Sequence, residues 1–118
     1  MTDELTDPYA AYGLALPDYA EEVLDVVDAI PEGQVLTYGD IAELVGRGGP
    51  RQVGSVMSHY GSATTWWRVI RADGRPPACH EGEAHQHYRE EGTPLRGERV
   101  DLRRARWDGP VERPTHPG

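Results

Sequence analysis

The chain contains no lysine and no phenylalanine, and Cys79 is its single cysteine. One cysteine cannot close an internal disulfide, so a small fold held together by disulfides is excluded and a reducing compartment is expected. No apolar run approaches the roughly 18 residues that cross a bilayer, and no basic segment followed by an apolar one marks a secretion signal. We therefore expect a soluble cytoplasmic protein without a membrane partner.

Basic charge is carried by arginine alone and is unevenly placed. Residues 1–50 hold eleven acidic side chains and one arginine, a balance of −10, whereas residues 51–118 hold eleven arginines and nine acids, a balance of +2. The resulting net charge of −8 argues against a protein that coats DNA. An acidic N-terminal half and an arginine-bearing C-terminal half would instead let the protein bind a polyanion in one orientation, weakly and with marked dependence on salt. The acidic side chains also keep the protein soluble.

A length of 118 residues fits one domain with a single core. Residues 1–17 contain acids, small residues and two prolines without clear periodicity, and we predict an N-terminal tail. The domain is predicted over residues 18–107. Prolines and glycines follow in residues 108–118, which we predict to be a C-terminal tail.

A helix is predicted directly after Asp18. Asp18 is suited to cap it, and four apolar residues follow at helical spacing: Val23, Val26, Val27 and Ile30. This helix is expected to pack behind the elements that follow.

The stretch from Thr37 to Tyr60 predicts two helices joined by a tight glycine-rich turn. Thr37 can cap the first helix together with Asp40, and Gly46 ends it. Pro50 suits the first position of the second helix. This is the pattern of a helix-turn-helix, in which the second helix is presented to a DNA groove.

The remaining sequence predicts shorter elements. Residues 66–70 have the bulky and β-branched content of a short buried strand. A turn is predicted over 72–74, and a polar helix over 83–91 that Gly92 ends. Residues 98–107 alternate weakly, so a strand or irregular edge is as compatible with them as a helix.

From Val23 to Gly92 the chain resembles the DNA-binding domain shared by O6-alkylguanine-DNA alkyltransferases and alkyltransferase-like proteins. The shared features occur in order: IPEGQVLTYGDIAELVG, PRQVGSVM, a quartet ending in arginine and followed by valine, and a helix ending Glu-Glu-Gly. The resemblance implies a mostly α fold with a short β element, the winged helix-turn-helix-like C-terminal domain of an alkyltransferase.

Active members of that family need a thiolate nucleophile in a Pro-Cys-His-Arg motif. The corresponding segment here is Thr65-Trp66-Trp67-Arg68, in which Trp66 replaces the cysteine and Trp67 replaces the histidine. An indole offers only a donor N–H, so nucleophile and base are both missing. We expect no enzyme activity and no cofactor. Alkyltransferase-like proteins commonly replace the same cysteine by tryptophan and retain lesion binding.

The resemblance also implies which residues contact DNA: Tyr38, Arg51, Gln52, Gly54 and Ser55. Arg51 matches the arginine finger that takes the place of an everted nucleotide, and Tyr38 matches the tyrosine that presses on that nucleotide's phosphate. The small Gly54 and Ser55 admit close approach to the minor groove. Without the resemblance, Arg51 is an exposed arginine at a helix N-terminus and Tyr38 a half-buried aromatic.

The predicted pocket for the everted base combines aromatic, apolar and charged side chains: Tyr38, Met57, Trp66, Arg68 and Glu91. Trp66 is expected to form its floor or wall, and it can fill the core at the same time. Trp67, one residue on in a strand, should point the opposite way into the core. Arg68 should be paired, with Glu91 as the expected partner.

The segment from Cys79 to His87 allows two other interpretations. Cys79-His80 mimics a nucleophile and its base, although nothing in the sequence directs the pair into the pocket. With His85 and His87 it also supplies four potential zinc ligands, but two histidines two residues apart lie on different faces of a helix. We expect a polar surface without metal.

The sequence thus predicts a monomeric, non-enzymatic sensor that binds alkylated duplex DNA, flips O6-alkylguanine and, by the resemblance, flags it to nucleotide excision repair proteins. The alternative is a sequence-specific helix-turn-helix transcriptional regulator. Such a regulator is usually a dimer that reads bases from its second helix. Here the exposed polar set on that helix is small, and no dimerisation element is evident.

Overall fold

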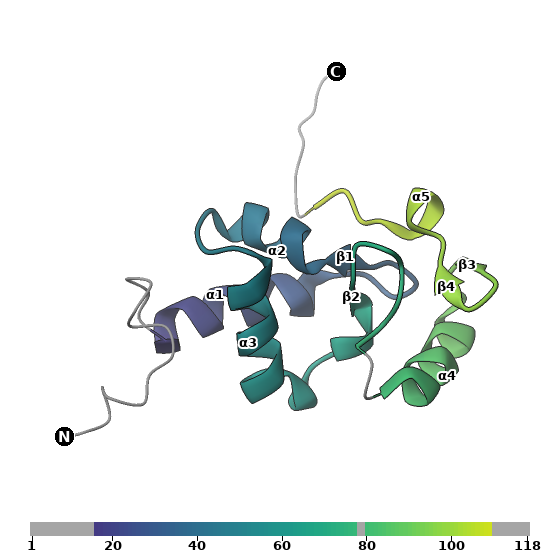
Figure 1. Ribbon diagram of the computed structural model, residues 1–118, viewed down its shortest axis with the longest axis horizontal. Helices are drawn as coiled ribbons and strands as arrows, with labels where there is room; N and C mark the ends of the chain where they lie inside the picture. Colours follow the sequence, from purple (N-terminus) through teal and green to yellow (C-terminus); the bar gives the residue numbers. More distant parts are fainter. Residues whose placement is uncertain (1–15, 78–79, 110–118) are drawn as a thin grey trace, which may run out of the picture.

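The computed structural model describes residues 16–77 and 80–109. Its α-helices, 3₁₀ helices (η) and short strands follow one another in this order: α1 (Leu16–Ala29), β1 (Leu36–Thr37), α2 (Tyr38–Val45), α3 (Pro50–Tyr60), η3 (Gly61–Ala63), η4 (Trp66–Arg68), β2 (Val69–Ile70), α4 (Glu81–Glu91), β3 (Leu95–Arg96), β4 (Arg99–Val100) and α5 (Leu102–Ala105). Figure 1 shows α1, α2 and α3 on one side and α4 with the β3–β4 hairpin on the other. The predicted mostly α fold is confirmed.

The first helix begins earlier than its sequence pattern predicted. α1 starts at Leu16, so Asp18 lies within the first turn and is not the cap. An acidic side chain in the first turn still interacts favourably with the positive end of the helix dipole. Most of the predicted tails, residues 1–15 and 110–118, lie outside the described residues, and their boundaries remain predictions. No helix of the described part is long and apolar enough to cross a membrane.

The predicted helix-turn-helix is present and is defined by its caps. The Thr37 hydroxyl accepts a hydrogen bond from the Asp40 N–H, and the Asp40 carboxylate accepts one from the Thr37 N–H, each at 3.0 Å. Gly46 ends α2 in the left-handed conformation, with φ 90°, which glycine adopts at little cost. Pro50 occupies the first turn of α3, as predicted. Local hydrogen bonds therefore fix where each helix starts and stops.

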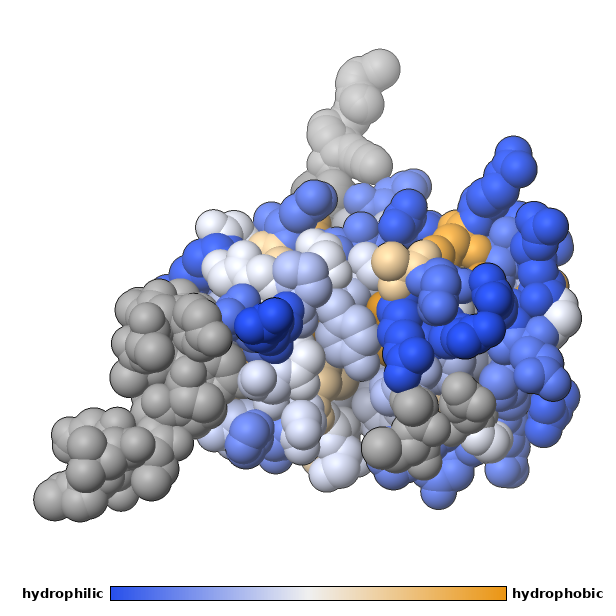
Figure 2. All heavy atoms as spheres, viewed as in Figure 1, coloured by the Kyte–Doolittle hydropathy of each residue, from blue (hydrophilic) through white to orange (hydrophobic). Residues whose placement is uncertain are grey.

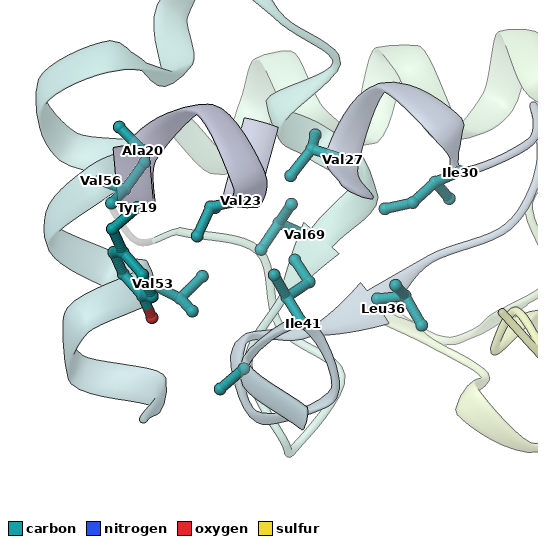
Figure 3. Packing of buried hydrophobic residues seen from close by; sticks show 11 residues of the cluster. Tyr19, Ala20, Val23, Val27, Ile30, Leu36, Ile41, Val53, Val56 and Val69 are labelled. Atoms are coloured by element: carbon teal, nitrogen blue, oxygen red, sulfur yellow. The ribbon is translucent and has the colours of Figure 1, made fainter. Parts of the chain in front are cut away.

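One core cluster holds these helices together. Figure 3 shows Val23 and Val27 of α1 pointing toward Val69 and Ile41, with Val53 of α3 beside them. All five side chains are fully buried. Burial on this scale contributes roughly 25 cal/mol for each Å² of apolar surface removed from water. Because α3 is anchored along one face, its opposite face is free to present side chains outward.

The two halves of the fold are joined by short strand pairings. β1 pairs in parallel with β2, with Leu36 opposite Val69. A second core cluster combines Val35, which precedes β1, with residues of the later part of the chain: Ile70, Ala84, Tyr88, Val100 and Ala105. The two tryptophans of η4 pack against this second cluster. The motif segment therefore sits between the two halves.

The predicted strand over residues 66–70 is wrong for its first three residues. Trp66–Arg68 form the 3₁₀ helix η4, and only Val69–Ile70 are extended. The Arg68 N–H donates to the Thr65 carbonyl at 3.0 Å, which closes the turn. The partner strand β1 has only two residues, so it offers no ladder for a longer strand to join.

The C-terminal part resolves what the sequence left open. α4 starts at Glu81, two residues before the predicted start, and ends at Gly92 as predicted. The region 98–107 contains both a strand, β4, and a short helix, α5. β3 and β4 form an antiparallel hairpin turned by Gly97, with φ 63°. The short β element of the predicted fold is therefore present.

Candidate functional site

A cavity of about 480 Å³ opens between α3 and the start of α4. Its volume is typical of small-molecule sites, which span roughly 300–1,000 Å³. Three residues of the predicted lesion pocket, Tyr38, Met57 and Trp66, line it. They come from the start of α2, from α3 and from η4, so the helix-turn-helix and the motif segment meet at one hollow.

Tyr38 brings a polar group to this cavity. Burial raises the pKa of its phenol, and the charge of Arg71 partly opposes that shift. The hydroxyl is therefore protonated at neutral pH and can donate a hydrogen bond.

Small residues of α3 keep the cavity open. Gly54 lines it, and a Cβ built on Gly54 would meet no atom within 4 Å. The fold itself therefore does not require glycine at this position. Ser55 is half-buried beside it. The absence of a side chain at Gly54 leaves room for a ligand to approach the helix closely.

Arg51 lies exposed in the first turn of α3. Within residues 16–77 and 80–109 it forms neither a hydrogen bond nor an ion pair. The neighbouring Gln52 is engaged differently, because its side-chain oxygen accepts a hydrogen bond from the Gly49 N–H at 2.9 Å. Of the two, Arg51 is thus free to reach a ligand, whereas Gln52 completes the helix N-terminus.

Arg68 and Glu91 form the predicted ion pair but do not line the cavity. Arg68 Nη2 donates to Glu91 Oε2 at 2.6 Å, and Arg68 Nε donates to Oε1 at 3.1 Å. Glu91 also accepts from the Gly33 N–H at 3.1 Å and from Trp67 Nε1 at 2.9 Å. Arg68 Nη1 donates to the Ile30 carbonyl at 2.8 Å. The pair therefore supports the motif segment from outside the cavity.

The charge state of Glu91 follows from these contacts. Burial of the carboxyl acts to raise its pKa, but hydrogen bonds from Arg68, the Gly33 N–H and Trp67 outweigh burial and hold the pKa below its usual value. The carboxylate is thus ionised at neutral pH and accepts all four N–H groups.

Trp67 packs against the second core cluster, but it does not point away from Trp66, as a strand would require. Successive residues of a 3₁₀ helix are turned by about 120°, compared with about 180° in a strand. The two rings meet edge to face, with centroids 5.6 Å apart. Trp67 is only half-buried, and its backbone carbonyl accepts a hydrogen bond from Tyr88 at 2.9 Å. Trp67 thereby holds the Trp66 ring, which lines the cavity, in its orientation.

The histidines of the two alternative sites make different contacts and do not gather at one place. His80 lines the cavity, 5.3 Å from the Trp66 ring, contrary to the expectation that its segment has no reason to face the pocket. His85 Nε2 lies 2.7 Å from the Glu98 carbonyl, and His87 stacks on Trp67. Cys79 is outside the described residues. Among the residues described, no three histidine, cysteine or acidic side chains are grouped to hold a metal.

Sequence reasoning missed six lining residues: Ser58, Gly61, Ser62, Pro77, His80 and Glu83. Ser58 lies one helical turn after Gly54, so helix spacing alone was sufficient to find it. Pro77, His80 and Glu83 belong to the loop after β2 and to α4. Their position depends on how α4 packs, which no local pattern reports.

Comparisons with known proteins agree with this arrangement. Residues 18–93 match the family described as the DNA-binding domain of 6-O-methylguanine DNA methyltransferase. A DNA base-flipping protein of Escherichia coli (strain K12) is 38% identical over 98 residues, which cover 76% of this chain and 74% of that one. Alkyltransferase-like protein 1 of Schizosaccharomyces pombe is 35% identical over 89 residues, which cover 70% of this chain and 82% of that one.

A solved structure extends the similarity to three dimensions. The crystal structure of S. pombe Atl1 in complex with damaged DNA containing O6-carboxymethylguanine matches with a TM-score of 0.70 and 30% identity, over 80% of this chain and 99% of that chain. The family match spans more than half of the 118 residues, and it includes the helix-turn-helix and the motif segment. The chain therefore belongs to the family of the 6-O-methylguanine DNA methyltransferase DNA-binding domain.

Proposed function

We propose that this protein is a non-enzymatic sensor of alkylated DNA, which binds duplex DNA through α3 and holds an everted O6-alkylguanine in the cavity beside that helix. The observation that carries the proposal is the juxtaposition of an exposed Arg51 with a cavity lined by Tyr38 and Trp66. The base-flipping relative and the Atl1 complex with damaged DNA support it.

In this proposal α3 enters the minor groove. Gly54 and Ser55 allow close approach, and Arg51 fills the gap in the stack that the everted nucleotide leaves. Flipping costs a few kcal/mol of lost stacking and pairing. A planar guanidinium offsets part of that cost, because it can stack on the neighbouring bases and hydrogen-bond to the orphaned base.

The cavity offers a fitting surface to a purine. Trp66 provides an aromatic face, and stacking of a base on such a face is worth about 1–3 kcal/mol. Met57 provides a polarizable apolar wall for an alkyl group. In this proposal the protonated Tyr38 hydroxyl, at the cavity, donates to the phosphate of the everted nucleotide.

Transfer of the alkyl group is not part of the proposal. Trp66 and Trp67 occupy the motif positions of cysteine and histidine, and an indole provides neither a thiolate nor a base. The described residues that line the cavity include no cysteine. Recognition without repair leaves the lesion in place, so we propose that the monomeric, cytoplasmic protein hands it to nucleotide excision repair proteins.

The test compares two labelled duplexes that differ only in one O6-methylguanine, titrated with the protein at moderate salt and followed by fluorescence anisotropy. We expect tighter binding to the modified duplex and full recovery of O6-methylguanine after digestion of the bound DNA. Loss of the methyl group would indicate transfer, and a Cys79→Ala variant then tells whether Cys79 is the acceptor. Equal affinity for both duplexes, with preference for one particular sequence, would point to a transcriptional regulator.

A further inference from the structure

A second cleft, of about 310 Å³, lies on the side of the fold that holds the β3–β4 hairpin. It is formed by the loop after β2, by α4 and by the β3–β4 hairpin. Three arginines line it, Arg75, Arg96 and Arg99. None of them belongs to the helix-turn-helix, and the proposed recognition of the lesion does not use them. We call this feature the arginine cleft.

The positive charge of the arginine cleft is poorly neutralised. Arg75 has an ion-pair contact with Asp73 at 3.9 Å, and both side chains are about half exposed. Within the described residues, Arg96 and Arg99 form no ion pair, and Glu98 is the one acid among the lining residues. Guanidinium groups present several donors in a fixed fork that matches the oxygens of a phosphate. The cleft is therefore suited to an anion with several oxygens.

The arginine cleft adjoins the lesion cavity. Pro76 lines the cleft and the next residue, Pro77, lines the cavity. On α4, Glu83 lines the cavity and His85, two residues further on and on another face of the helix, lines the cleft, so α4 separates the two features. In Figure 2 the surface over α3 is mostly pale, and strongly hydrophilic side chains gather to its right, below a hydrophobic patch. A polyanion that lies across α3 and reaches the cavity is thus brought up to the arginine cleft.

We propose that the arginine cleft binds one or two phosphodiester groups of the duplex seated on α3, beyond the part of the DNA that the helix-turn-helix covers. This inference deepens the proposed function, because the same DNA occupies both places. Phosphate contacts fix the orientation of a protein on DNA without reading its sequence. Here they would align the cavity with one strand, in a protein whose net charge of −8 otherwise opposes DNA binding.

The test removes the three charges and compares a matched control. The variant Arg75→Gln, Arg96→Gln, Arg99→Gln removes the three arginine charges of the cleft and leaves Glu98 in place. The control Arg89→Gln, Arg103→Gln, Arg104→Gln removes three exposed arginines that line neither cavity. Thermal unfolding confirms that both variants are folded. Affinity for an unmodified and an O6-methylguanine duplex is then measured over a range of salt concentrations.

We expect the cleft variant to reduce the slope of log Kd against log salt by about 1–2, because each bound phosphate contributes about 0.9. Affinity near 0.1 M salt should fall about tenfold for each phosphate that the cleft no longer binds. The control should keep the wild-type slope. An equal change in both variants would mean a general charge effect, and no change in either would mean that the cleft serves something other than DNA. Both results overturn the proposal.

Neutral methylphosphonate linkages, placed one at a time along each strand, identify the phosphates. The wild-type protein should lose affinity at one or two positions where the cleft variant loses none. A wild-type protein indifferent to every linkage beyond the α3 contact would overturn the proposal. The same measurements can be made on unmodified duplex. A protein that does not prefer O6-methylguanine would contradict the proposed function, and the salt slopes and methylphosphonate results on unmodified duplex would still test the arginine cleft.

Discussion

The indole of Trp67 lies parallel to the imidazole of His87, with ring centroids 3.6 Å apart and planes 4° apart. The indole N–H donates to Glu91, so the ring is held at its face and at its edge. Trp66 meets that ring at 87°. The orientation of the aromatic wall of the cavity therefore depends on residues of α4 that do not line it.

Replacing Trp66 tests the wall directly. Trp66→Ala should reduce the preference for the O6-methylguanine duplex by about 1–3 kcal/mol, since a stacking face is lost. Affinity for unmodified duplex should stay near the wild-type value, because the everted base alone uses the face. Anisotropy titrations with both duplexes measure the two effects. Trp66→Phe keeps an aromatic face and should retain much of the preference; an unchanged preference in Trp66→Ala would remove Trp66 from the site.

Arg51 offers a second test, in which charge and shape are separated. Arg51→Ala should weaken lesion binding at least tenfold, about 1.4 kcal/mol or more, without lowering the melting temperature, because the side chain is exposed. Arg51→Lys keeps the charge but loses the planar stacking surface, so it should restore salt-dependent affinity and not the preference for the lesion. Full recovery of that preference by lysine would contradict the role of a stacked finger.

Gly54 allows function to be separated from stability. Gly54→Ala should stabilise α3 by about 0.5–1 kcal/mol, since glycine is unfavourable within a helix and the added Cβ meets nothing within 4 Å. Gly54→Leu should fold equally well and block DNA binding by filling the space between α3 and its ligand. Urea unfolding and anisotropy measure the two properties. A leucine variant that still binds the modified duplex would show that this face of α3 is not the contact.

Glu91 is predicted to be the main polar contributor to stability. Its side chain is 8% exposed and that of Arg68 14%, so Glu91→Gln leaves a largely buried guanidinium without its counter-charge. We expect a loss of about 2–3 kcal/mol in the free energy of unfolding, measured in urea. The matched control is the adjacent Glu90, whose side chain is 62% exposed. Glu90→Gln should change stability by less than about 0.5 kcal/mol.

The pH dependence of stability should follow the same carboxylate. Contacts in the folded state lower the pKa of Glu91. The contribution of Glu91 to folding stability is therefore complete above the pKa of an unfolded glutamate, about 4.3. It is lost as the pH falls through the lower pKa of the folded state. The stability difference between wild type and Glu91→Gln should therefore be constant from pH 7 to about 5 and shrink below about pH 4. Urea midpoints at each pH measure it, and a difference that persists undiminished at pH 3 would refute this assignment.

The helix-turn-helix was predictable because its boundaries depend on local chemistry. Thr37 and Asp40 cap one helix by contacts three residues apart, and Gly46 ends it in a conformation that favours glycine. The Arg68–Glu91 pair was predictable for a different reason: a charge within an apolar stretch needs a partner. A short window of sequence contains the capping signals and the unpaired charge of Arg68, whereas the choice of Glu91, 23 residues further on, is what the family resemblance implies.

The conformation of the motif and the second wall of the cavity were not predictable in this way. Trp66–Arg68 have the composition of a strand, yet the two-residue partner β1 offers them no ladder. His80 and Glu83 reach the cavity only because α4 packs against the motif. Tertiary contacts of this kind override local propensity, and they leave no periodic trace in the sequence.

The hydrogen bond between the Gly33 N–H and Glu91 joins residues 58 positions apart. During synthesis the turn after α1 emerges from the ribosome long before the carboxylate that completes it. Because synthesis runs from the N-terminus, α1 to α3 are complete before α4 emerges, and Trp67 then lacks its contacts with His87 and Glu91. The cavity takes shape only when α4 arrives. A nascent or truncated chain that ends before Glu91 would therefore carry the groove-binding helix without a place for the base it displaces.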